Sequence, residues 1–422
     1  MFRKLFCAAS VAALVACASQ TAKTQAPAAQ PAPSTAPKTR LAHYLPDETT
    51  YPVGSIPNAV LHDAARNKDL YMTIEYPTRG GPYPVIVFSH GFGGSNVGYT
   101  PLTEYWAGHG YIVIKPSHAD SGKLGPILEQ RREERRAEME KARAEGRGRN
   151  GRNTPQTTQG QEQKAQQPDP LAEAIWSTQT TADWVNRARD ISLILDNLTN
   201  LEKKYPELER RMDTSKIGVS GHSYGAFTAM MVSGMTSFAA TPAIQAADPR
   251  VKAAVVFSPQ GTGSLGLTKD SWKDVTIPIM YVTGSLDYFM AGDAKPRHDA
   301  FAYSPAGDKY FVSFNGARHM TFAGGTFGDI SDEEIPVRTT NGGYGGTDPW
   351  GNPQPQMATR GAGGRGGSSL YQRDRRIFTA AKIASTAFLD AYLKGDTAAK
   401  DYLKPGGTLE SFNSGEVTVE RK

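Results

Sequence analysis

Short, almost entirely apolar runs recur along this chain and limit its fold more than any other feature. Their length and composition are typical of parallel strands that are buried on both faces of a sheet. They are Val85–Ser89, Tyr111–Lys115, Ile217–Ser220, Ala253–Ser258, Ile277–Thr283 and Tyr310–Phe314. Stretches with helical periodicity, such as Trp184–Leu198 and Ile377–Leu393, lie between or after them. This alternation predicts an α/β fold with a mostly parallel sheet. Two further strand-like pieces precede the apolar runs, within Ala59–Thr78.

The remaining stretches divide the 422 residues into segments. Residues 18–45, rich in Ala, Pro, Thr and Gln, predict a disordered tether, because they contain few large apolar side chains. The α/β domain is expected over residues 46–404, with a C-terminal tail at residues 405–422. Two insertions are expected within it, a charged helix with a low-complexity tract at residues 123–170 and a Gly-rich segment at residues 324–369. A solvated helix and loop is the interpretation of the first insertion, and a lid or a contact with an anionic surface is its alternative.

The amino terminus has the features of an export signal. Arg3 and Lys4 precede an apolar stretch that ends in Leu14-Val15-Ala16-Cys17, which resembles the bacterial lipoprotein signal. We expect residues 1–17 to be a signal peptide with a lipobox, cleaved before Cys17, whose sulfur then carries the lipid anchor. The stretch is shorter than the ~20 residues of a spanning helix. We therefore expect a lipid-anchored protein of the bacterial cell envelope, at the outer membrane because no aspartate follows Cys17. An ordinary secretory signal in which Cys17 is incidental is the alternative.

The residue composition excludes several kinds of chemistry. Cys7 and Cys17 are the two cysteines of the chain, so the α/β domain has no thiol for a disulfide, a thiolate metal site or a cysteine nucleophile. The histidines and acidic residues show no zinc-binding pattern, and we expect neither a metal nor a cofactor. The formal net charge is +5, which gives little support for a nucleic-acid partner.

The sharpest local motif is Gly221-His222-Ser223-Tyr224-Gly225. It follows the predicted strand Ile217–Ser220 and precedes a helix-like stretch, Ala226–Val232. Glycines on either side of the serine allow a tight turn that exposes its Oγ above the sheet edge, with a helix amino terminus beside it. The motif predicts Ser223 as a nucleophile, because the strand before it and the helix after it distinguish it from a chance match.

An acid and then a histidine follow in the chain order that such a nucleophile requires. The strand Ile277–Thr283 leads through three residues to Asp287, and the strand Tyr310–Phe314 leads to His319. We predict that His319 takes the Ser223 proton and that Asp287 fixes the tautomer of His319 and stabilises its charged form.

Other residues could fill these roles. Asp293 lies farther into the loop after the strand, and Asp308 lies immediately before the next strand, so both fit the position of the acid less well. Six other histidines lie before the main sheet, around an early strand, inside the elbow or before the last strand; they are His43, His62, His109, His118, His222 and His298. Of these, His222 is expected to pack or form hydrogen bonds rather than to catalyse.

Donors for a substrate oxyanion are expected after the strand Val85–Ser89. The segment His90-Gly91-Phe92-Gly93-Gly94 has glycines that allow backbone N–H groups to approach a substrate oxygen. We predict an oxyanion hole formed by the backbone N–H groups of Phe92 and Tyr224. A strand-to-helix turn without a catalytic role is the alternative.

These segments together resemble the α/β-hydrolase superfamily over roughly Ala59–Leu403. The segments Asp63–Asp69, Phe88–Gly93, Arg187–Ile191 and 221–225 look like those of bacterial dienelactone-hydrolase-like and platelet-activating-factor-acetylhydrolase-like esterases. The resemblance implies an eight-stranded sheet with helices on both faces. It also places the nucleophile at Ser223, the acid at Asp287, the base at His319 and the oxyanion donors at Phe92 and Tyr224.

The departures from these relatives narrow the expected reaction. True dienelactone hydrolases have a cysteine nucleophile where Ser223 stands, and polyester hydrolases have a tryptophan where Pro259-Gln260 stands. The short stretch between Ser258 and Ile277 predicts no large cap domain after the sixth strand. Apolar residues beside the predicted site suggest an apolar pocket; they are Phe92, Tyr224, Tyr288, Phe289, Met290, Met320 and Phe322.

We therefore expect a serine carboxylic-ester hydrolase that cleaves short or medium acyl esters, including lipid esters, through an acyl-enzyme. A peptidase or amidase with the same triad is one alternative. The other is a non-catalytic surface-binding lipoprotein on a hydrolase scaffold.

Overall fold

A computed structural model describes most of the predicted α/β domain. The described residues are 49–123, 179–287, 295–324, 366–412 and 415–422, with scattered helical positions between 125 and 141. The predicted signal peptide, Cys17, the tether and most of both insertions lie outside them. Within the described part of the chain, no helix combines the length and the apolar character that crossing a membrane requires.

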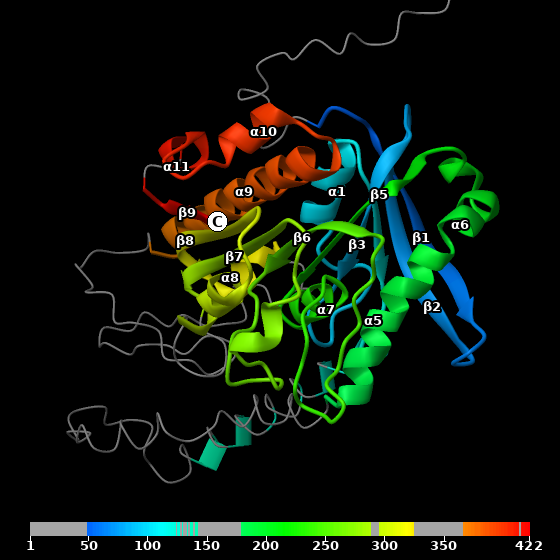
Figure 1. Ribbon diagram of the computed structural model, residues 1–422, viewed down its shortest axis with the longest axis horizontal. Coiled ribbons are helices and arrows are strands. Elements are labelled where there is room, and N and C mark those ends of the chain that lie inside the picture. The colour runs from blue at the N-terminus through cyan, green and yellow to red at the C-terminus, as the bar shows by residue number, and fades with distance from the viewer. Residues whose placement is uncertain are drawn as a thin grey trace, which may run out of the picture. The chain divides into compact units, whose positions relative to one another are not determined.

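The described strands form one nine-stranded sheet in the order β1-β2-β4-β3-β5-β6-β7-β8-β9 (Figure 1). The strands are β1 (Val53–Asp63), β2 (Lys68–Pro77), β3 (Tyr83–Ser89), β4 (Ile112–Pro116), β5 (Met212–His222), β6 (Val251–Phe257), β7 (Ile279–Leu286), β8 (Lys309–Arg318) and β9 (Val417–Arg421). Strands β4, β3, β5, β6, β7 and β8 run parallel, whereas β1 and β2 at one edge and β9 at the other are antiparallel to their neighbours. The apolar runs thus form the parallel centre of the sheet, as predicted.

The predicted count of eight strands is wrong, and the sheet is antiparallel at both edges. The ninth strand comes from residues 405–422, which were expected to form a tail. Val417 and Val419 are buried and pair with Phe314 and Val312 of β8, while the residues between and after them face outward. A short edge strand with one buried face has a weaker sequence signal than a run buried on both faces, because only alternate residues are apolar.

Helices cover both faces of the sheet (Figure 1). On one face, α1 (Thr100–Gly108) and α9 (Gly366–Leu393) pack in a core with side chains of β3, β6 and β8. On the other face, α5 (Thr181–Asp196) and α7 (Tyr224–Val232) pack against the side chains that point the opposite way from the same sheet. The smaller helices are α6 (Leu198–Lys204), α8 (Asp299–Tyr303), α10 (Thr397–Tyr402) and α11 (Thr408–Phe412).

Helix α5 begins and ends close to the predicted bounds. Thr180 caps its amino terminus: the Thr180 hydroxyl accepts a hydrogen bond from the Asp183 N–H, and the Asp183 side chain bonds back to the Thr180 backbone. The predicted stretch Trp184–Leu198 includes one residue of α6, because the chain breaks its helical path at Asn197.

Residues 258–278, all of which the structure describes, contain a single helical turn, η3 (Lys269–Trp272). This segment therefore holds no large cap domain between β6 and β7. The carboxyl ends of β3, β5, β7 and β8 meet at one edge of the sheet, since these strands are parallel, and Ser89 of β3 pairs with Gly221 of β5 there. The predicted site residues follow these four strand ends.

Candidate active site

Ser223 occupies a strained turn between β5 and α7. Its backbone has φ 56° and ψ −120°, a conformation that residues other than glycine rarely adopt. A Cβ atom on Gly225 would overlap the carbonyl oxygen of Ser89, and one on Gly221 would overlap the carbonyl of Gly225. The Ser223 N–H donates to the Phe257 carbonyl at 2.9 Å, which ties the turn to β6. The two glycines are therefore needed for the close passage of β3 and the elbow.

Asp287 and His319 form a hydrogen-bonded pair after β7 and β8. His319 Nδ1 lies 2.8 Å from Asp287 Oδ1, and Thr283 Oγ1 donates to Asp287 Oδ2 at 2.9 Å. Both partners are buried, with 0% of Asp287 and 4% of His319 exposed. Burial alone would raise the pKa of Asp287, but the Arg297 guanidinium and His319 hold that pKa well below its ordinary value. Asp287 is therefore ionised and accepts a hydrogen bond from the Nδ1–H group of His319, so Nε2 is the basic nitrogen of His319.

His222 connects the elbow to His319. His222 Nε2 donates to the His319 carbonyl at 2.8 Å, and the Tyr99 hydroxyl lies 2.9 Å from His222 Nδ1. The rings of His222 and His319 have centroids 4.7 Å apart. Burial lowers the pKa of His222 to about 3, so the ring is neutral and Nδ1 accepts from Tyr99. The residue before Ser223 thus holds the backbone of the predicted base at the same sheet edge.

Arg297 is a residue of this site that the sequence did not reveal. It lies in η4 (Lys295–His298), and its Nη2 is 3.2 Å from Asp287 Oδ1 and 3.3 Å from His319 Nδ1. Its Nη1 donates to the carbonyls of Ser258 and Pro259, both at 2.8 Å. Nothing in the local sequence marks an arginine before a short helix, and only its burial beside the carboxylate identifies it.

The two alternative acids differ in position from Asp287. Asp308 lies at the amino end of β8, whereas Asp287 and His319 lie at the carboxyl ends of their strands. Asp308 forms ion pairs with Lys400 at 3.1 Å and Arg421 at 2.7 Å. Asp293 lies outside the described residues. Asp287 is the carboxylate that the described structure places against His319.

The two predicted oxyanion donors lie on neighbouring segments. Tyr224 is the first residue of α7, so its N–H has no acceptor within the helix. In the segment after β3, the Gly91 N–H donates to Tyr99 Oη at 3.2 Å and the Gly93 N–H donates to Asp120 Oδ2 at 3.0 Å. These bonds fix the backbone on both sides of Phe92, and the rings of Phe92 and Tyr224 lie 6.2 Å apart.

The residues proposed to line an apolar pocket separate into two groups. Phe322 is fully buried in the core beneath α9, and Met320 packs against that core while partly exposed. Phe92 and Tyr224 are buried beside the elbow, in the core of the opposite face. Tyr288, Phe289 and Met290 lie outside the described residues.

Among the described residues, no group of three or more His, Cys, Asp or Glu side chains is arranged to hold a metal ion.

The parallel sheet, the strand-turn-helix at Ser223 and the Asp287–His319 pair after later strands define an α/β-hydrolase-like protein. Residues 60–329 match the family model of platelet-activating factor acetylhydrolase, isoform II. The chain belongs to this family, whose description names an acetylhydrolase, and the predicted resemblance to it is confirmed.

A curated relative is similar over much of the same region. It is the platelet-activating factor acetylhydrolase of Cavia porcellus, which is 21% identical over 271 residues. The alignment covers 62% of this chain and 54% of the relative, so the chain spans about half the length of the relative that it matches.

Proposed function

We propose that this protein is a serine hydrolase that cleaves carboxylic esters with short or medium apolar acyl groups. The observation that carries the proposal is the buried Asp287–His319 hydrogen bond, held through His222 beside the strained Ser223 turn. An ionised carboxylate on Nδ1 leaves Nε2 as the proton acceptor, which is the arrangement that activates a serine hydroxyl.

The reaction proceeds through an acyl-enzyme. Ser223 Oγ attacks the ester carbonyl carbon while its proton passes to Nε2 of His319, and the carbonyl oxygen becomes an oxyanion. When the tetrahedral species collapses, the ester C–O bond breaks and the imidazolium protonates the leaving alkoxide. Water then attacks the acyl-Ser223 ester by the same route, which releases the acid and restores the hydroxyl.

The oxyanion is stabilised by backbone donors in this proposal. In this proposal the N–H groups of Phe92 and Tyr224 donate hydrogen bonds to the oxygen as it becomes charged, and the amino terminus of α7 adds a favourable dipole. The loss of one such donor typically costs about 2.7 to 4 kcal/mol of transition-state stabilisation.

The substitution Ser223→Ala tests the proposal. We expect it to abolish turnover of p-nitrophenyl esters and labelling by a fluorophosphonate probe, whereas Ser215→Ala, an exposed serine on the same strand, keeps both. Labelling that persists in Ser223→Ala would overturn the proposal. Aminoacyl anilides assayed in parallel distinguish an ester hydrolase from a peptidase with the same triad.

The family description suggests the first substrates to assay. We propose that acetyl esters of phospholipids belong to the accepted class, because the relative that the chain matches is named for acetyl hydrolysis of platelet-activating factor. A panel of phospholipids with acetyl to palmitoyl chains measures the preference. Turnover that rises steadily with chain length contradicts the short-acyl part of the proposal.

We also propose that Cys17 carries a lipid anchor in the bacterial cell envelope, on the support of the Leu14-Val15-Ala16-Cys17 pattern alone. Radiolabelled palmitate supplied to a bacterial host tests it. We expect label in the full chain and none in Cys17→Ser; an unlabelled full chain refutes the anchor.

A further inference from the structure

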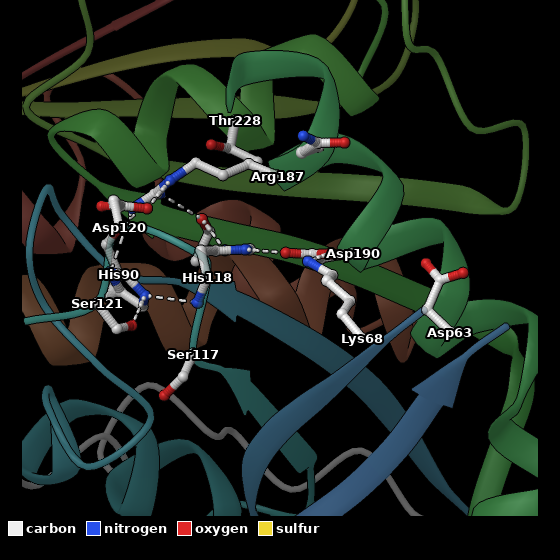
Figure 2. A network of polar contacts seen from close by, with 12 residues as sticks. Asp63, Lys68, His90, Ser117, His118, Asp120, Ser121, Arg187, Asp190 and Thr228 are labelled. Atoms are coloured by element: carbon white, nitrogen blue, oxygen red, sulfur yellow. Dashed lines mark hydrogen bonds and ion pairs between the residues drawn. The ribbon is translucent and has the colours of Figure 1, made fainter. Parts of the chain in front are cut away.

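A network of buried polar side chains, drawn in Figure 2, contacts the backbone on both sides of Phe92. Its members come from the segments that follow β3 and β4 and from α5; they are His90, His118, Asp120, Arg187 and Asp190. None of them has more than 5% of its surface exposed. The proposed reaction uses none of these side chains, although buried charges are costly to maintain.

Arg187 holds the backbone on the amino-terminal side of Phe92. Its Nη1 donates to the His90 carbonyl at 2.8 Å and to Ser89 Oγ at 3.2 Å, and its Nη2 donates to the Gly91 carbonyl at 3.4 Å. A planar guanidinium with several donors can make these bonds at once, whereas an ammonium cannot reproduce the same fork.

Asp120 bonds to the backbone on the carboxy-terminal side of Phe92. Arg187 donates to both of its carboxylate oxygens, through Nε at 2.9 Å and Nη2 at 2.7 Å. The same carboxylate accepts the Gly93 N–H at 3.0 Å. Burial alone would raise the pKa of Asp120, but Arg187 keeps it well below its ordinary value, so the carboxylate is charged. The Arg187–Asp120 pair therefore bonds to the backbone before and after the predicted donor.

The same guanidinium also contacts the second donor residue. Arg187 Cζ lies 4.2 Å from the centroid of the Tyr224 ring, in the geometry of a cation–π contact. The two predicted oxyanion donors lie on segments that are separated by more than a hundred residues in the sequence. The Arg187 side chain therefore contacts both segments.

A second chain of hydrogen bonds joins Ser89, which accepts from Arg187, to His118 and Asp190. Asp190 Oδ2 lies 2.9 Å from His118 Nδ1, and His118 Nε2 lies 2.9 Å from Ser89 Oγ. Lys68 at 2.6 Å and Arg66 at 2.7 Å both form ion pairs with Asp190 Oδ1. This order of serine, histidine and aspartate resembles a triad, but Ser89 is fully buried and accepts from Arg187, so its hydroxyl braces the guanidinium instead of facing a substrate.

We propose that Arg187, oriented by Asp120, is a positioning residue that sets the distance between the Phe92 and Tyr224 N–H groups. The inference rests on the proposed function, because it assigns a role toward the oxyanion of the same reaction. Donors of an oxyanion hole must lie within hydrogen-bond distance of the charged oxygen, and a displacement of about 1 Å can cost about 10²-fold in rate.

The substitution Arg187→Lys tests this role. Lysine keeps a positive charge beside Asp120 but cannot bind His90 and lie over Tyr224 at the same time. With p-nitrophenyl butyrate, we expect kcat to fall about 10²-fold with little change in KM, because the hole acts in the transition state. Inactivation by a fluorophosphonate should slow by a similar factor, since the phosphonyl oxygen occupies the same hole.

Arg250→Lys is the matched control. Arg250 makes the same two-bond contact with an aspartate, through Nε at 2.8 Å and Nη2 at 2.7 Å to Asp248, but contacts neither donor segment. We expect wild-type kcat for this variant. Thermal unfolding of both variants separates a loss of fold from a loss of rate.

If Arg187→Lys does not fold, Tyr224→Leu removes the ring that Arg187 contacts while it keeps the backbone N–H. We then expect a fall in kcat of about tenfold or more with the fold intact. A folded Arg187→Lys or Tyr224→Leu variant with wild-type kcat, or with an effect on KM alone, overturns the inference. Turnover that survives Ser223→Ala would instead refute the proposed function, so the two failures are distinguishable.

Discussion

Removal of the charge on Arg297 should move the acid limb of the pH profile to higher pH. The guanidinium Nη2 lies 3.3 Å from His319 Nδ1 and 3.2 Å from Asp287 Oδ1, so it opposes protonation of this buried pair. Two unit charges about 4 Å apart interact by about 1 kcal/mol in water and by about 4 kcal/mol at an effective dielectric constant near 20. Since about 1.4 kcal/mol corresponds to one pH unit, Arg297→Gln should raise the acid limb by between about 0.7 and 3 pH units.

The sign follows from the role of the base. A protonated His319 cannot accept the Ser223 proton, so any change that favours protonation removes activity at a higher pH as the pH falls. The assay is kcat/KM for p-nitrophenyl butyrate against pH, which reports the free enzyme. Arg297→Lys keeps the charge and serves as the control, with its acid limb expected within a few tenths of the wild-type position.

An Arg297→Gln variant whose acid limb coincides with that of the wild type would refute this reasoning. Equal displacement in Arg297→Lys and Arg297→Gln would also refute it, because the effect would then follow from lost packing and not from lost charge. Each profile is measured below the unfolding temperature of the variant, so a loss of stability does not imitate a loss of activity.

Two further substitutions have outcomes that the packing dictates. Gly225→Ala should reduce fluorophosphonate labelling by at least about 10²-fold, because the new Cβ would overlap the Ser89 carbonyl and displace the elbow from the Phe92 segment. Gly98→Ala is the control and should be labelled as the wild type is, since the nearest neighbour of its new Cβ would lie at 3.4 Å. Unchanged labelling of Gly225→Ala contradicts the argument. Lys115→Met should lower the free energy of unfolding, measured by denaturant titration, by about 3 to 5 kcal/mol, because it leaves Glu75 buried without the ammonium that lies 2.5 Å from its carboxylate. Adding Glu75→Leu to the same chain should restore most of this loss. A single Lys115→Met loss of less than about 1 kcal/mol would show that this pair is not a strong contributor.

The sequence predicts the centre of the sheet well and its edges less well. The parallel strands are apolar at nearly every position, because both of their faces are covered by helices, and such runs stand out without any knowledge of the fold. β9 alternates buried valines with exposed residues over a short length, and this pattern has no distinct signal until β8 lies beside it.

The candidate site divides in the same way. Ser223, Asp287 and His319 could be selected from the sequence because each closely follows an apolar run, and the carboxyl ends of parallel strands share one edge of a sheet. The role of the glycines around Ser223 could also be predicted from the sequence, since a tight turn requires residues without a Cβ.

The roles of Arg187 and Arg297 could not be predicted from the sequence. Each acts through a carboxylate that becomes its neighbour only after folding, Asp120 for Arg187 and Asp287 for Arg297. The sequence by itself therefore determined which strands form the centre of the sheet and which polar residues follow them, because hydrophobic periodicity and glycine content are local. The tertiary structure alone decided which charges are buried together, because desolvation and the pairing of charges depend on contacts between segments far apart in the chain.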